Sequence, residues 1–226
     1  MFFCIVSYIG KVLFKTPLKF CNGSLFDCEG ALFPISPRRA ALPAEPAPVI
    51  PLLEKCVSDN INMLCLEIDE SLITLENGVL REDSPALAAL DLLLEESWQR
   101  GIYLAITPIT RRIRIPDGRS ENAIRDDEPI FAERYYDQLF RHVNPHSGRK
   151  FYKYENLAAI EPVLALETFS VKRLWAYIHH IRAFVQHFFL NRLLEVYFTD
   201  RGPVSEDLRS CLLDFGAWVL WSAATK

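Results

Sequence analysis

The chain has 226 residues, of which 50% are apolar, so it can bury a core and is expected to form one principal domain. Its net charge of -4, with lysines and arginines dispersed along the chain, argues against a nucleic-acid-binding surface. The six cysteines include no Cys-x-x-Cys pair, which indicates reduced thiols in a cytoplasmic protein rather than a disulfide framework or a zinc site.

The first 33 residues are expected to form an N-terminal extension packed on the main domain. Their lysines follow the apolar run instead of preceding it, unlike those of a secretory signal, and no segment of the chain reaches the apolar length of a membrane span. Residues 34–60 are predicted to be a proline-rich connector and a short helix. Six prolines between Pro34 and Pro51 predict stiff, extended chain, and 49–58 predicts the helix.

Residues 61–226 are predicted to form an α/β domain. Met63 to Ile68 is apolar except for Glu67 and predicts a buried strand, and Ile102 to Thr107 predicts a second one. Between them, Asn77-Gly78 predicts a hairpin, and a helix follows from Ser84-Pro85. Strand, hairpin, helix and strand together predict a right-handed parallel crossover.

A charged, irregular insertion is expected around 108–130. The elements expected after it are a helix (131–142), a short strand (151–154), a long helix (171–189), a strand ending in Asp200 (194–200) and a last strand (217–221). The pattern around 157–166 predicts no particular element.

Two carboxylates one residue apart, Glu67 and Asp69, stand at the carboxyl end of the first predicted strand of this domain. Parallel α/β proteins place their binding sites at such strand ends. The pattern resembles the first motif of the haloacid dehalogenase (HAD) superfamily, in which a strand ends Asp-x-Asp-x-Thr and the first Asp accepts the phosphate. The resemblance implies a Rossmann-like three-layer sandwich with a mainly parallel central sheet.

The resemblance also implies a role for one residue of each of its motifs. Glu67 takes the position of the nucleophile, Asp69 that of the acid/base and Thr107 that of the strand-end hydroxyl. Lys172 matches the lysine of the third motif, and Asp200 matches the metal-binding carboxylate of the fourth. The implied function is a phosphohydrolase that acts on a phosphate ester with Mg²⁺, held by Glu67, Asp69 and Asp200.

Several departures from the HAD pattern favour a weakened or lost activity. Glu67 is one methylene longer than Asp, which displaces its carboxylate by more than about 1 Å, and such a displacement can cost about 10²-fold in rate. Ser71 replaces threonine, and Pro108 removes a backbone donor. The alternative is therefore a catalytically degenerate HAD-fold protein that binds a phosphorylated small molecule or a protein partner.

Two further alternatives concern the carboxylates. The stretch from Leu25 to Phe33 also resembles the first HAD motif, with Asp27 as the nucleophile and Glu29 as the acid/base. Alternatively, Glu67 and Asp69 have structural roles only, and cap a neighbouring helix or pair with Arg111.

Overall fold

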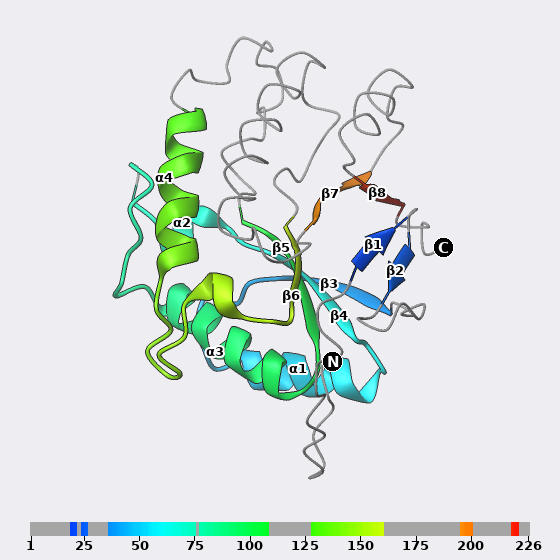
Figure 1. Cartoon of the computed structure of the whole chain (residues 1–226). Helices are drawn as coiled ribbons and strands as arrows, with labels where there is room; N and C mark the ends of the chain where they lie inside the picture. Colours follow the sequence, from blue (N-terminus) through cyan, green and yellow to red (C-terminus); the bar gives the residue numbers. More distant parts are fainter. Residues whose placement is uncertain are drawn as a thin grey trace, which may run out of the picture.

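The structure is a computed structural model that describes residues 19–21, 24–26, 36–75, 77–108, 128–160, 195–200 and 218–221. The first two strands, β1 (Lys19–Cys21) and β2 (Ser24–Phe26), form an antiparallel pair. A six-stranded sheet follows, made of β3 (Pro37–Ala41), β4 (Met63–Glu67), β5 (Tyr103–Thr107), β6 (Leu157–Ile160), β7 (Glu195–Asp200) and β8 (Trp218–Trp221) (Figure 1). The described helices are α1 (Val49–Ser58), α2 (Glu70–Ile73), α3 (Pro85–Gln99), α4 (Glu128–Arg141) and the 3-10 helix η2 (Phe151–Lys153).

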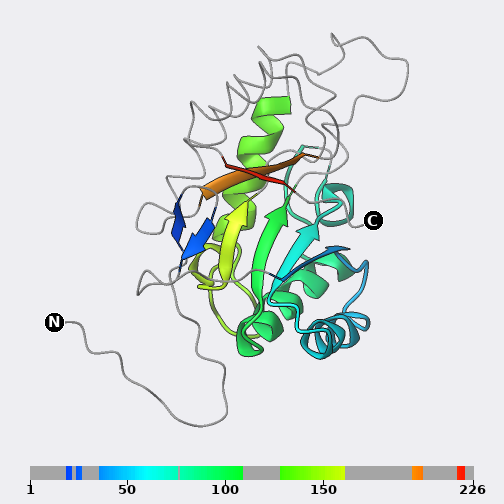
Figure 2. The same ribbon diagram turned by 90° about the vertical axis from the view of Figure 1, so that its right-hand side faces the viewer.

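The strand order decides the architecture. From β3 to β8, each strand pairs in parallel with the next strand along the chain. Right-handed crossovers that always step in the same direction leave their helices on one face of the sheet. Accordingly, α1 and α3 contact each other and lie on the same side of β4 and β5 (Figures 1 and 2). A sheet wound in this single direction has the organisation of a barrel wall.

The predicted Rossmann-like sandwich of HAD type is therefore wrong. A doubly wound sheet reverses its strand order at a switch point and carries helices on both faces. No such reversal occurs among the strands that the structure describes. The two arrangements use the same local units, so the difference lies only in which strands pair.

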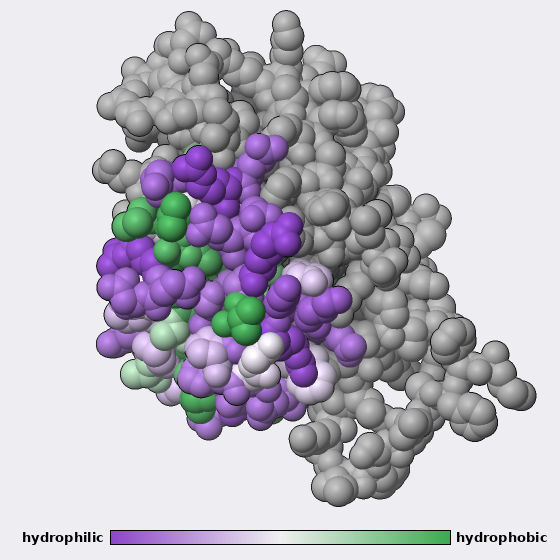
Figure 3. Space-filling model, turned by 60° about the vertical axis from the view of Figure 1, so that its left-hand side comes forward, coloured by the Kyte–Doolittle hydropathy of each residue, from purple (hydrophilic) through white to green (hydrophobic). Residues whose placement is uncertain are grey.

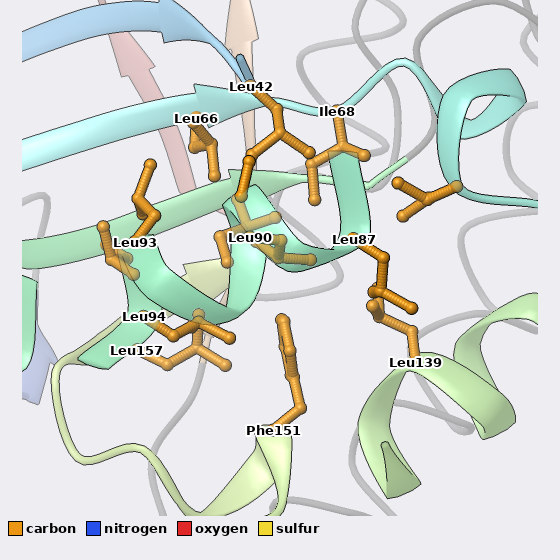
Figure 4. Packing of buried hydrophobic residues seen from close by; sticks show 14 of the residues in the cluster. Leu42, Leu66, Ile68, Leu87, Leu90, Leu93, Leu94, Leu139, Phe151 and Leu157 are labelled. Atoms are coloured by element: carbon orange, nitrogen blue, oxygen red, sulfur yellow. The ribbon is translucent and has the colours of Figure 1, made fainter. Parts of the chain in front are cut away.

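Side chains of β4 alternate between the two faces of the sheet. Leu64 and Leu66 belong to the apolar core between the sheet and the helices. Met63 and Cys65 are also buried but lie outside that core, on the opposite, inner face, which Glu67 shares by alternation. The core itself is built from leucines of α1 and α3 with aromatic residues of α4 and η2. Figure 4 shows part of it, where leucines of α3 lie near Leu139 of α4 and Phe151 of η2. Burial of each leucine contributes about 1.5–3 kcal/mol.

Several predicted elements are confirmed. Helix α1 has the predicted bounds, and α3 begins as predicted, with the Ser84 hydroxyl accepting a hydrogen bond from the Leu87 N–H and Pro85 in the first turn. The Asn77-Gly78 turn follows the short helix α2 and is closed by an antiparallel bridge between Thr74 and Leu80. Strands β7 and β8 also lie where the sequence predicts them.

Other elements differ from the prediction. The expected strand at 151–154 is the 3-10 helix η2, and the strand of this region, β6, comes just after it. The proline-rich stretch contains β3, whose first residue is Pro37, a position where a strand tolerates the missing N–H. Lys172, Asp27 and the predicted helix over 171–189 lie outside the described residues.

The surface of the described part offers no large apolar face in the view of Figure 3, where hydrophilic residues surround small, separate apolar patches. The exposed large apolar residues of the described part are Val57, Leu75 and Val143. Isolated residues of this kind are normal on a protein surface. Among the described helices, none combines the length and apolarity needed to cross a membrane.

Candidate functional site

The ends of β4 and β5 bring two of the predicted residues together. Glu67 and Thr107 are register partners, and the backbone continues this pairing, because the Ile68 N–H donates to the Thr107 carbonyl at 2.9 Å. Partners in register lie on the same face, so both side chains belong to the inner face. Thr107 is 2% exposed. Asp200 ends β7, and because the sheet is parallel it lies at the same carboxyl edge, three strands from Glu67.

Glu67 forms an ion pair with an arginine that the sequence analysis did not single out. Arg39 Nη1 lies 3.2 Å from Glu67 Oε1, and the two side chains are 30% and 21% exposed. In the register of β3 and β4, Arg39 is opposite Cys65 and Ala41 is opposite Glu67, which places Arg39 on the inner face as well. The sequence did not indicate that Arg39 pairs with Glu67, because the proline-rich stretch predicts an extended connector and not the strand β3 that carries Arg39.

Asp69 has a local structural role. Its carboxylate accepts hydrogen bonds from the Ser71 N–H at 3.2 Å and from the Ser71 hydroxyl at 2.6 Å, and so caps the N-terminus of α2. A side-chain acceptor of this kind satisfies a backbone donor that the helix leaves open. The helix-capping alternative thus describes Asp69, whereas Glu67 pairs with Arg39.

Helix α4 contacts the chain immediately after β5. Tyr135 is buried, and its hydroxyl donates a 3.0 Å hydrogen bond to the Pro108 carbonyl, one residue beyond Thr107. Burial raises the pKa of Tyr135 well above its ordinary value, and the nearby carboxylates of Glu70 and Asp69 raise it further. The phenol therefore stays protonated and keeps its role as a donor.

The described side chains do not assemble a metal site. Within the ranges given above, no three side chains of the His, Cys, Asp and Glu types come together in a way that could hold an ion. Glu67 and Asp69 are instead bonded to Arg39 and Ser71. The side chain of Asp200 and all of Lys172 lie outside what the structure describes.

A carboxylate that the sequence analysis passed over follows the next strand. Glu161 comes directly after Ile160, the last residue of β6, and itself lies outside the described residues. The signal that could have found it is the one that found Glu67, an apolar run ending in an acid. Leu157 to Ile160 is a shorter run, so its strand was not predicted.

No family model matches the sequence, and no curated protein matches it either. Solved structures do resemble the fold. An endo-1,4-β-mannanase from Rhizomucor miehei superposes with a TM-score of 0.65 at 12% identity, over 84% of this chain and 64% of that one. The hyperthermostable endo-1,4-β-D-mannanase from Thermotoga petrophila gives 0.60 at 19% identity, over 76% and 58%. A glycoside hydrolase family 5 mannosidase from Rhizomucor miehei gives 0.63 at 10% identity, over 86% and 58%.

These likenesses establish a fold of the (β/α)8-barrel type. The chain spans less than two thirds of the length of each of these proteins. The HAD resemblance was wrong, and with it the phosphohydrolase and the degenerate HAD alternative. The Mg²⁺ that the resemblance implied stays a prediction. The spacing of Glu67 and Asp69 suited the HAD motif because both folds place polar residues at the carboxyl ends of parallel strands.

Proposed function

We propose that this protein is a glycoside hydrolase that cleaves β-1,4-linked mannose polymers. The observation that carries the proposal is the barrel-type order of the strands, with Glu67, Thr107 and Asp200 at one carboxyl edge. Enzymes with a (β/α)8 barrel have their active sites at this edge. The structures that share the fold include mannanases and a mannosidase, which supplies the class of substrate.

Glycoside hydrolysis needs two carboxyl groups on either side of the scissile bond. One protonates the leaving oxygen, and the other attacks the sugar carbon or activates a water. Glu67 is the better candidate of the two acids at the end of β4, because it lies on the inner face, whereas Asp69 caps α2.

The second carboxylate has to come from another strand end. Neighbouring strands are about 4.8 Å apart, so the ends of β4 and β6 are separated by about 10 Å. Two carboxyl groups that flank a glycosidic bond are about 5–9.5 Å apart, a separation that glutamate side chains extending toward each other from these strand ends can reach. Glu161, the residue after β6 in the sequence, is therefore the partner we propose, with Asp200 at the end of β7 as the other candidate.

The test is release of reducing ends from β-1,4-mannan by the purified 226-residue chain. We expect activity in the wild type and a loss of about 10²-fold or more in Glu67→Gln and Glu161→Gln. Glu155→Gln is the matched control, because this exposed residue precedes β6 and so lies at the amino end of the strand, away from the proposed site. A wild type without activity on mannan would overturn the proposal.

The remaining expectations concern the cellular location of the protein and its partners. A cytoplasmic location, inferred from the cysteine pattern, and the lack of a nucleic-acid partner, inferred from the charge, remain predictions.

A further inference from the structure

We propose that Arg39 and Glu67 form a binding site for adjacent hydroxyl groups of a neutral sugar, in which Arg39 also positions Glu67. That the ligand is a sugar rests on the proposed function. The site itself follows from the contacts of the two side chains.

The geometry makes the pair accessible at the edge where a barrel binds its ligand. Arg39 comes from β3 and Glu67 from the end of β4, and both side chains lie on the inner face. They retain 30% and 21% exposure although their charged groups are 3.2 Å apart. A ligand can therefore reach the pair without breaking it. Thr107, opposite Glu67 in register, lies beside it on the same face and is buried.

The chemistry of the pair suits hydroxyl groups. A carboxylate only accepts hydrogen bonds, and a guanidinium only donates them. Side by side, they present an acceptor and a donor to a pair of hydroxyls, each of which can donate and accept. The hydrogen bonds would involve ionised groups, which form stronger bonds than neutral ones.

The charges disfavour an anionic ligand. The positive charge of Arg39 is offset by Glu67, and the two ionisable residues that follow in the described chain, Asp69 and Glu70, are both acidic. A phosphate or a uronic acid would therefore find no unbalanced positive charge at the Arg39–Glu67 pair, while a neutral sugar does not need one.

The chain contains a matched control for this pair. Arg38 is the neighbouring residue on β3, and its Nη1 lies 3.3 Å from Asp59 Oδ2 at the end of α1. Because side chains alternate along a strand, Arg38 points to the helix-covered face. Two arginines with similar ion pairs thus lie on opposite faces of the same strand.

The experiment is calorimetric titration of the full chain with β-1,4-mannotetraose, and separately with an oligogalacturonate as the anionic probe. We expect the neutral probe to bind and the anionic probe to bind at least 10-fold more weakly. Arg39→Met and Glu67→Gln should each weaken binding of the neutral probe by about 10- to 100-fold, and Arg38→Met should leave it unchanged. Arg39→Lys should restore part of the affinity, because it keeps the charge but loses the fork of donors.

The outcomes separate this inference from the proposed function. Mannan hydrolysis with mannotetraose binding that is insensitive to Arg39→Met and Glu67→Gln would overturn the site and leave the hydrolase standing. Binding that depends on both residues, without hydrolysis by the wild type, would support the site and overturn the hydrolase. Tighter binding of the anionic probe would overturn the site. Glu67→Gln keeps the shape of the side chain, so it tests the site even if Arg39→Met fails to fold.

Discussion

His142 Nε2 lies 3.0 Å from each carboxylate oxygen of Asp91, and the two side chains are 7% and 4% exposed. The contact joins the middle of α3 to the residue that follows α4. The exposed carboxylate of Glu82 lies 3.6 Å from the other ring nitrogen, and Asn144 donates to the Asp91 carbonyl. This arrangement connects two helices through one titratable ring.

The His142 contact predicts that stability depends on pH. Burial alone would lower the pKa of His142, but the hydrogen bond and charge of Asp91, together with Glu82, raise it above its ordinary value. A raised pKa in the folded state means that protonation stabilises the fold. This contribution is complete below the unfolded-state pKa of about 6.5 and is lost as the pH rises through the folded-state pKa.

We therefore expect the free energy of unfolding, measured with urea, to decrease as the pH rises above 6.5. His142→Gln should remove this part of the pH dependence and should be less stable than the wild type at the acidic end. If the two proteins show the same slope against pH, the Asp91 contact does not control the stability.

Gly78 is expected to resist substitution for two separate reasons. Its φ of +80° is in the left-handed region, and a Cβ atom there would lie 3.0 Å from the Phe131 carbonyl oxygen on α4. Gly148 has a φ of +66° but open space around a Cβ. Both alanine variants should lose about 1–2 kcal/mol from backbone strain, and Gly78→Ala should lose more. Thermal unfolding of the two variants measures the difference, and equal losses would show that the contact with Phe131 relaxes freely.

Two substitutions of Asp69 can separate its helix-capping role from a role in catalysis. Asp69→Asn keeps a side-chain oxygen that can accept from the Ser71 N–H, whereas Asp69→Ala removes the cap and should cost about 1 kcal/mol. If Asp69 only caps α2, Asp69→Asn should retain the mannan-hydrolysing activity of the wild type. A large loss of activity in Asp69→Asn, with stability unchanged, would instead make Asp69 part of the reaction.

Tyr135 should stabilise the chain that follows β5 through its hydrogen bond to the Pro108 carbonyl. Tyr135→Phe removes the donor and leaves the Pro108 carbonyl without that bond, at an expected cost of about 1–3 kcal/mol. Urea denaturation measures the loss. A variant as stable as the wild type would show that another group or a water replaces the phenol.

The local elements could be predicted from the sequence, but their arrangement could not. The apolar runs that became β4 and β5, and the Ser84-Pro85 signal that begins α3, are local patterns. Strand, helix and strand in succession occur in both singly and doubly wound sheets, and only long-range pairing distinguishes them. The pairing of Glu67 with Arg39 could not be predicted either, because it also depends on long-range strand pairing. Arg39 precedes Glu67 by 28 residues and lies in a strand whose proline-rich sequence predicts a connector.

The order of the strands also bears on how the protein is made. Because each strand of the larger sheet pairs with the strand that precedes it in the chain, every new strand can dock as soon as it is synthesised, without waiting for a later segment. Once the ribosome has released Ile160, β3 to β6 and the helices α1, α3 and α4 are all present. Pairing between successive strands keeps each loop closure shorter than pairing between distant strands would, which lowers the entropic cost of every pairing.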